Sequence, residues 1–213
     1  MQLLITTILN EIDLSQEELE VLHYSILVQK VTKGDFLSES KAKPNCLYFV
    51  QSGLLRVYLL RDEKQEYLIQ FAPEGSWIVE DNYYVALPSS NYYIQAIEET
   101  IVLILDAKKF LQLLGAIPKL ELFFRKLMQQ HIAELHWRII NNLTCFADDL
   151  YSMFVQNYPD LAQRVPLYMI ASYLGVKPET LSRSRRNIAS KNKQKTFDKH
   201  PLAKILDDQS KGF

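Results

Sequence analysis

The chain has 213 residues, 48% of them hydrophobic, and a formal net charge of −1 at pH 7. This length suits one domain of about 130 residues with a smaller partner domain, and the apolar content is enough for a buried core. The longest apolar run, residues 101–105, is too short to cross a bilayer, and the first residues lack the basic start and cleavage site of a secretory signal. We therefore expect a cytoplasmic protein with no membrane partner.

Cysteines and histidines are too few and too scattered for a metal centre. The two cysteines, Cys46 and Cys145, have no CxxC spacing, which excludes an iron–sulfur cluster and a zinc–thiolate site. No histidine occurs between His23 and His131, so the strand-rich part of the chain cannot supply the histidine cluster of a jelly-roll oxygenase. We expect no metal, no cofactor and no enzyme activity.

The first 26 residues have a helical pattern, which then changes to short strands. Ser15 is placed to cap a helix, with Glu18 three residues later as its capping-box partner. Between residues 28 and 105, apolar and polar residues alternate in short runs, separated by glycine-containing turns at 33–35, 52–53 and 73–75. Many short strands at this spacing predict a β-sandwich or a jelly-roll barrel, and we expect the jelly roll.

Helical periodicity returns after Asp106, which is placed to cap the next helix. From Leu120 onward, an apolar residue recurs every three or four positions and predicts one face of a long helix. Part of this face must rest on the barrel, but an apolar row leading out of a β domain also suits pairing between two subunits. We expect a dimer seam along this helix, formed by Phe124, Met128, Ile132, Leu135 and Ile139.

Residues 170–186, IASYLGVKPETLSRSRR, fit a helix-turn-helix. Such a motif needs a small residue where the helices cross, a glycine in the turn and an apolar residue facing back, which Ala171, Gly175 and Leu181 supply. Pro178 suits the first position of the second helix, because its missing N–H needs no partner there. The segment 177–204 holds nine Lys or Arg and two acids, so positive charge is concentrated at this end of the chain.

In a major groove, the first residues of this second helix would face the base edges. We assign base readout to Glu179, Ser182 and Arg183. The Glu179 carboxylate can accept a hydrogen bond from the cytosine amino group, the Arg183 guanidinium can donate two hydrogen bonds to guanine, and the Ser182 hydroxyl can contact either base. We assign phosphate contacts to four further residues: Lys177, Thr180, Arg185 and Arg186. The alternative is a charged surface helix in which Glu179 and Arg183 form an i,i+4 pair.

The order of these parts resembles the bacterial transcription regulators of the Crp/Fnr family. The resemblance is carried by VTKGDFL at 31–37, LYFVQSGLLRVY at 47–58, FAPEGSWI at 71–78 and the segment 170–186. It implies an α+β protein with a cyclic-nucleotide-binding-like jelly roll at 1–110, a dimerisation helix at 111–143 and a helix-turn-helix domain at 144–213. It also implies a homodimer that binds double-stranded promoter DNA, with RNA polymerase as a further candidate partner.

The effector pocket departs from the cyclic-nucleotide binders of this family, which place a Gly-Glu pair at the ribose and an arginine at the phosphate. Val79-Glu80 and Ser89-Ser90-Asn91 stand there instead, and no Arg or Lys occurs between positions 64 and 108. A buried cyclic phosphate without a cation carries a heavy desolvation cost. We therefore expect the jelly roll to sense a small molecule other than cyclic AMP. The expected pocket residues are Trp77, Glu80, Ser90, Asn91 and Tyr92.

Three alternatives stay open at this point. The aromatic rings near the pocket either receive a planar or apolar ligand or simply pack the barrel. The basic tail after Ile188 has one glycine in residues 190–213, so it does not favour the β-hairpin wing that is common in the family. This tail either adds phosphate contacts or is disordered. Ser184 replaces the usual inward aliphatic residue of the second helix. The rival interpretation of the whole chain is a ligand-binding signalling module whose helical end contacts proteins.

Overall fold

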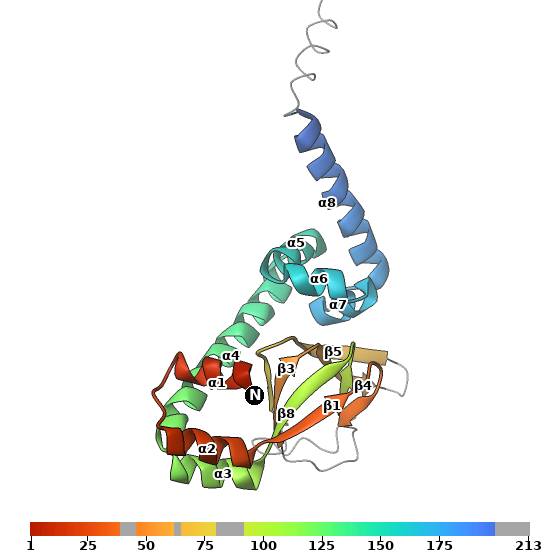
Figure 1. Cartoon of the computed structure of the whole chain (residues 1–213). Coiled ribbons are helices and arrows are strands. Elements are labelled where there is room, and N and C mark those ends of the chain that lie inside the picture. Colours follow the sequence, from red (N-terminus) through yellow and green to blue (C-terminus); the bar gives the residue numbers. More distant parts are fainter. Residues whose placement is uncertain (39–45, 62–64, 80–91, 199–213) are drawn as a thin grey trace, which may run out of the picture. The chain divides into compact units, whose positions relative to one another are not determined.

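The computed structural model describes residues 1–38, 46–61, 65–79 and 92–198, with the backbone alone at Tyr92, Ala189 and 191–198. The chain is an α+β protein with two compact units, Met1–Arg138 and Ile139–Phe213 (Figure 1). The described helices are α1 (Gln2–Leu9), α2 (Gln16–Ser25), α3 (Ala107–Ala116), α4 (Lys119–Thr144), α5 (Ala147–Asn157), α6 (Pro159–Arg164), α7 (Leu167–Leu174) and α8 (Pro178–Asp198). The boundary between the units falls inside α4.

Two antiparallel four-stranded sheets form the centre of the first unit. Their strands are β1 (Leu27–Val31), β2 (Phe36–Ser38), β3 (Cys46–Ser52), β4 (Leu55–Arg61), β5 (Gln65–Ala72), β6 (Trp77–Val79), β7 (Tyr92–Ala96) and β8 (Thr100–Asp106). One sheet has the order β1-β8-β3-β6 and the other the order β2-β7-β4-β5. Apart from the β4–β5 hairpin, described strands that follow each other in the chain alternate between the two sheets, as in a jelly roll, and the predicted jelly-roll architecture is confirmed.

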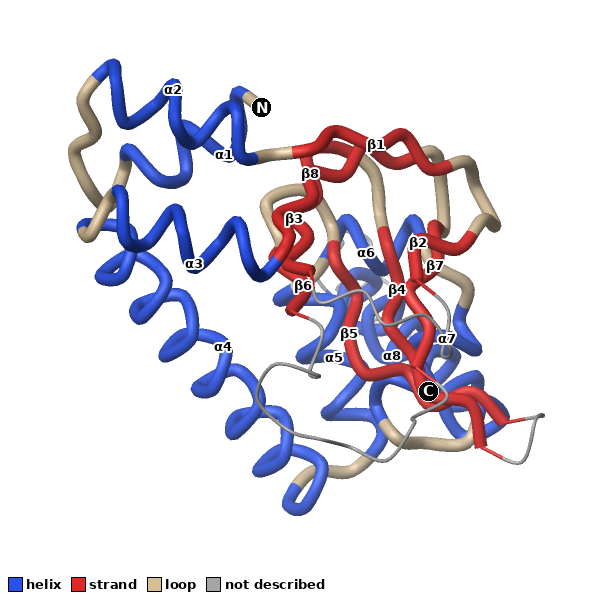
Figure 2. Tube along the Cα trace, turned by 90° about the horizontal axis from the view of Figure 1, so that it is seen from below, coloured by secondary structure: helices blue, strands red, loops and turns tan. Residues whose placement is uncertain are grey.

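Strands β3, β6 and β8 of the first sheet bury apolar side chains on both faces. On β3, Tyr48 and Val50 point into the core between the two sheets, whereas Leu47 and Phe49 belong to a second core on the opposite face. Helices α1 to α4 cover that second face, and Figure 2 shows α3 and the first half of α4 beside β3, β6 and β8. Burying each large apolar side chain in this way stabilises the folded state by about 1.5–3 kcal/mol. The four helices are therefore part of this unit's core.

Helix starts in the first unit follow the local signals of the sequence. The Ser15 hydroxyl accepts from the Glu18 N–H at 3.2 Å, and a Glu18 carboxylate oxygen accepts from the Ser15 N–H at 2.7 Å, so the predicted capping box is confirmed. Lys119 Nζ donates to the same carboxylate at 2.9 Å, and these hydrogen bonds lower the pKa of Glu18. Asp106 caps α3 by accepting from the N–H groups of Lys108 and Lys109.

Gly53, in the turn between β3 and β4, is required by both backbone conformation and space. Its φ is +93°, and a Cβ there would lie 2.5 Å from the Glu99 carbonyl oxygen and 2.6 Å from Thr100 Oγ1. The neighbouring Leu54 N–H donates to the same hydroxyl at 3.1 Å. Only glycine tolerates this positive φ together with such close backbone approach. The turn therefore holds the β3–β4 connection against the start of β8.

The second unit is helical. Helix α8 packs on α5 and α7, and the buried side chains among its described residues are Leu150, Phe154, Leu161, Val165, Ile170, Ala171, Leu174, Leu181 and Ser184. This core is small, and α8 reaches well beyond the other helices of the unit (Figure 1). The packing thus uses only the first part of α8.

Candidate nucleic-acid interface and effector domain

The turn between α7 and α8 has the geometry predicted from the sequence. Gly175 is left-handed, with a φ of +68°. Its N–H donates to the Ser172 carbonyl at 3.2 Å, and the Val176 N–H donates to the Ala171 carbonyl at 3.0 Å. These two bonds form a Schellman motif, which satisfies carbonyls at the end of α7 and reverses the chain. The predicted glycine turn is confirmed.

Helix α8 starts where the sequence places it and is held by one apolar residue. Pro178 is its first residue, and the Leu181 N–H donates to the Lys177 carbonyl at 3.1 Å. Leu181 is fully buried, and so is Ala171 on α7, where a small side chain lets the two helices approach. Ser184 is also buried on the inward side of α8. A leucine or isoleucine at this position would bury more apolar surface, so the serine leaves α8 less firmly packed.

The outward side of α8 carries the residues predicted to contact DNA. Glu179, Arg183 and Arg186 are exposed on one face, three to four residues apart. Lys177 and Arg185 are also exposed, whereas Thr180 and Ser182 are half-buried. Among the described ion pairs none joins Glu179 to Arg183, and Arg186 Nε donates to the Ser182 carbonyl at 3.4 Å. Both guanidinium groups and the carboxylate are therefore open to solvent.

The segment after Ile188, whose structure the sequence left open, continues α8 as a helix to Asp198. Helix thus occupies the chain positions where many relatives have a β-hairpin wing. This stretch contains Lys191, Lys193 and Lys195 and a single acid, Asp198.

The long helix α4 divides its apolar face between two environments. Phe124 is buried in the first unit, against Trp77, Phe110 and Phe123, with ring centroids 4.6–5.2 Å apart. Its assignment to an open dimer seam is therefore wrong, because the helix-facing side of the sheet needs this ring to complete its core. The exposed row starts one turn later.

The row after Phe124 is open over most of its length. Met128 and Leu135 are half-buried, and Ile132 and Ile139 are 52% and 54% exposed. Leu143, 80% exposed, extends the same face by one turn. The sequence analysis did not include Leu143, although its spacing of four from Ile139 continues the periodicity. A contiguous exposed apolar row of this kind marks an interaction surface.

Of the five predicted effector-pocket residues, the structure describes the side chain of Trp77 alone. Trp77 lies on the helix-facing side of β6, in contact with Phe49, Phe123 and Phe124, and so does not line the space between the sheets. Alternation along β6 turns Ile78 inward and Trp77 outward, so a pocket that includes Trp77 would lie on the helix-facing side of the sheet, and its assignment to the pocket stays a prediction. Glu80, Ser90 and Asn91 lie outside the described residues, and Tyr92 is the first residue of β7.

The core between the sheets is apolar where the structure describes it. It is lined by Val31, Tyr48, Val50, Leu55, Val57, Ala72, Ile78, Ile94, Ala96 and Val102. The one buried cation of the described strands, Arg56, lies between Leu55 and Val57 on β4 and therefore points to the opposite face. No cation of these strands thus faces the space in which a nucleotide phosphate would need one.

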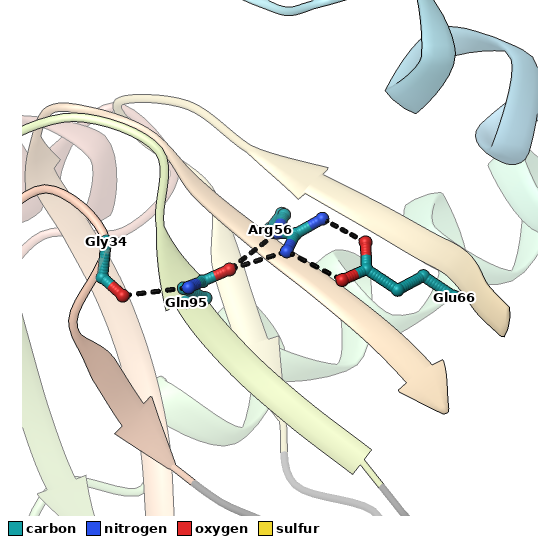
Figure 3. A network of polar contacts seen from close by, with 4 residues as sticks. All are labelled: Gly34, Arg56, Glu66 and Gln95. Carbon is teal, nitrogen blue, oxygen red and sulfur yellow. Dashed lines mark hydrogen bonds and ion pairs between the residues drawn. The ribbon is translucent and has the colours of Figure 1, made fainter. Parts of the chain in front are cut away.

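Arg56 is instead the centre of a polar network on the outer face of the second sheet (Figure 3). Its guanidinium donates to both carboxylate oxygens of Glu66 on β5, at 2.5 and 3.1 Å, and to Gln95 Oε1 on β7, at 2.6 and 2.9 Å. Gln95 Nε2 donates to the Gly34 carbonyl at 2.8 Å. The network therefore connects three strands and the β1–β2 turn.

An aromatic stack completes this face. Arg56 Cζ lies 4.3 Å from the centroid of the Tyr58 ring, which stacks on Tyr93 with centroids 5.2 Å apart. Burial raises the pKa of Tyr58, opposed by the nearby positive charge of Arg56. This network was not predicted from the sequence. A lone arginine between apolar residues of one strand, with an acid on the next strand, could have indicated it.

Comparisons with known proteins agree with this architecture. The cyclic nucleotide-binding domain family matches residues 28–116. Among solved structures, a CooA mutant from Carboxydothermus hydrogenoformans is 22% identical, with a TM-score of 0.65 over 86% of this chain and 83% of that one. FixK2 from Bradyrhizobium japonicum is 15% identical, with a TM-score of 0.66 over 78% and 86% of the two chains. The chain has the Crp/Fnr fold.

The c-di-GMP responsive global regulator CLP of Xanthomonas campestris also shares this Crp/Fnr fold, with 10% identity and a TM-score of 0.68 over 84% of this chain and 93% of that one. No curated protein matches the sequence. The fold implied by the Crp/Fnr resemblance is confirmed, and the matched domain covers β1 to α3. No helix in the described part of this Crp/Fnr-like chain has the length and apolarity of a membrane span.

The Arg56 network predicts a measurable difference between two glutamates. Glu66→Ala should lower the free energy of unfolding in urea by about 1–3 kcal/mol, because it removes the charge partner of a buried guanidinium while Gln95 remains. The matched control is Glu99→Ala, which removes an exposed ion pair between Glu99 and Lys30. The side chains of Lys30 and Glu99 are 63% and 65% exposed, so this variant should lower the free energy of unfolding by less than about 1 kcal/mol. Equal losses for both variants would contradict a stabilising role for the network.

Proposed function

We propose that this protein is a transcription regulator that binds double-stranded DNA as a homodimer through α7 and α8. One observation supports this most directly: α8 buries Leu181 and Ser184 against its own unit while Glu179, Arg183 and Arg186 stay exposed and unpaired with each other. A helix held in this way behind a glycine turn presents its first turns to a major groove. The Crp/Fnr fold supports a regulator rather than an enzyme, and we assign no catalytic residue.

The roles of the α8 residues follow from their chemistry and exposure. Arg183 offers a guanidinium that can donate two hydrogen bonds to guanine N7 and O6, and Glu179, one turn earlier, can accept from a cytosine amino group. Ser182, half-buried beside them, serves as a secondary base contact. Phosphate contacts, which set affinity and register, come from Lys177, Thr180, Arg185 and Arg186. RNA polymerase remains a candidate partner.

The homodimer is proposed on the exposed row of α4. Met128, Ile132, Leu135, Ile139 and Leu143 share one face, and an isolated chain would leave this face in water. Pairing two copies of α4 through it would bury the row from both sides, as in a coiled coil. Two helix-turn-helix units would then address two half-sites of a duplex.

The jelly roll is proposed to sense a small molecule other than cyclic AMP. Arg56, the one buried cation of the described strands, is on the outer face and is engaged by Glu66 and Gln95. The described core between the sheets is apolar, and residues 65–107 contain no Lys or Arg. These features favour an uncharged ligand over a cyclic phosphate.

The DNA-binding proposal is tested by selecting duplexes from a random pool and measuring affinities for the enriched sequence and its single-base variants. Arg183→Ala should lose about 1–3 kcal/mol of discrimination at one base pair. The matched control, Arg185→Ala, should weaken all sequences by a similar factor. If no sequence is enriched, or if both variants behave alike, the proposal fails, and absence of any duplex binding favours the signalling-module alternative.

The dimer proposal predicts the effect of a charge in the α4 row. Ile132→Glu should weaken self-association by about 3 kcal/mol or more, at least about a hundredfold, because two buried isoleucines per dimer are replaced by carboxylates. Sedimentation equilibrium should show the mass falling from two chains to one. The control Leu122→Glu, on the same helix but outside the row and 41% exposed, should leave the mass unchanged. A wild-type mass of one chain, also with bound duplex, would exclude the homodimer.

The effector proposal predicts no response to cyclic nucleotides. Millimolar cyclic AMP or cyclic di-GMP should leave the thermal unfolding midpoint unchanged, whereas a true ligand at a hundredfold excess over its Kd would stabilise the fold by about 2.7 kcal/mol. An uncharged metabolite panel in the same assay searches for the ligand. Stabilisation by cyclic AMP would refute the argument from the missing cation.

A further inference from the structure

Helix α8 is twice as long as its packing requires. It spans 21 residues, about 30 Å at 1.5 Å per residue. Its inward row of Leu181, Ser184 and Ile188 accounts for about the first 16 Å, which already exceeds the 12 Å width of a major groove. We call residues 189–198 the α8 extension. In Figure 1, α8 runs on past α5, α6 and α7, so the extension begins where the unit's own core ends.

The sequence of the extension is not that of a packed helix. Continuing the inward row by three and four residues leads to positions 191 and 195, and both are lysines. The apolar row therefore stops at Ile188, and no second apolar row replaces it, because Phe197 is the only large hydrophobic residue of the extension. A protein partner recognised through a helix face would need such a row.

The charge of the extension matches a polyanion instead. The extension contains three lysines, Lys191, Lys193 and Lys195, and a single acid, Asp198. It begins three residues after the exposed Arg183, Arg185 and Arg186. Lys191 and Lys195 are a like-charged i,i+4 pair, which disfavours an isolated helix by about 0.2–0.5 kcal/mol. Lys193 lies two turns after Arg186 on the same face. A bound polyanion would remove the repulsion and use all three charges.

We propose that the α8 extension is a second DNA-contacting element, which binds phosphates flanking the bases read by the first turns of α8. It takes the place that the wing occupies in relatives, with a straight helix rather than a hairpin. A recognition helix whose later turns contact the backbone is physically feasible, since homeodomains use theirs in this way. This inference rests on the proposed DNA-binding function and adds where on the duplex the protein gains its affinity.

The extension would act on affinity and salt dependence and not on sequence choice. Each phosphate neutralised by a lysine contributes about 0.9 to the slope of log K against log salt concentration. Three contacts therefore correspond to about 2.7 per bound protomer, or an additional affinity loss of about 40-fold between 50 and 200 mM salt. The base contacts of Arg183 lie elsewhere on the helix, so the ratio between specific and nonspecific affinity would stay the same.

The test uses the full-length variant Lys191→Gln/Lys193→Gln/Lys195→Gln, which keeps good helix formers while removing three charges. Its salt slope should fall by about 2–3 per bound protomer on both the selected duplex and a random-sequence duplex of the same length. The charge-matched control, Lys33→Gln/Lys108→Gln/Lys109→Gln, changes three exposed lysines of the first unit and should keep the wild-type slope. Far-UV circular dichroism and thermal unfolding verify that both variants are folded.

A second measurement locates the contacts. Trimming the duplex to the selected base pairs should reduce the salt slope of the wild-type protein to that of the triple variant. The salt slope of the triple variant itself should not change on the trimmed duplex. A triple variant with the wild-type slope, or with altered base preference, overturns the inference even if Arg183→Ala still loses discrimination. Failure of the proposed function looks different, because then no duplex is enriched and neither variant shows salt-dependent binding.

Discussion

The first unit depends on one constraint: strands β3, β6 and β8 bury apolar side chains on both faces of their sheet. These strands send alternate side chains into the core between the sheets and into a second core under the helices. A sheet of this composition cannot leave either face in water, so α1 to α4 are required for its stability. The ring cluster of Trp77, Phe110, Phe123 and Phe124 is part of this second core, and it fixes the first turns of α4 on the sheet.

That attachment also explains why α4 has an open row. The first turns of the helix pack on the sheet, and beyond them the apolar residues at 128, 132, 135, 139 and 143 have no comparable cover in the described part of the chain. An exposed apolar row on a helix is costly in water unless a partner covers it. The same element thus contributes to the core at its start and offers an association surface along the rest.

Charge is distributed in the two units in opposite ways. In the first unit, the buried Arg56 is satisfied within the fold by Glu66, Gln95 and the Tyr58 ring, so its charge serves cohesion between strands. In the second unit, the arginines of α8 are exposed and the apolar side of the helix carries the packing. A guanidinium that is already engaged cannot serve a ligand without losing its partners. The exposed arginines of α8 therefore remain available to a polyanion.

The sequence by itself determined the features that depend on near neighbours. The capping box at Ser15, the cap at Asp106, the left-handed turn at Gly175 and the helix start at Pro178 are each decided within a few residues, and the pattern of short strands predicted the jelly roll. The exposed face of α8 also followed from helical periodicity.

Only the tertiary structure decided which of two apolar environments each residue enters. Alternation along β6 shows that Trp77 and Ile78 face opposite ways, but not which one faces the space between the sheets, because both faces of that sheet are covered. The same ambiguity placed Phe124 in an open row when the sheet in fact buries it. The Arg56 network likewise joins positions up to 61 residues apart, and such pairing arises from strand register, which residues on a single strand do not encode.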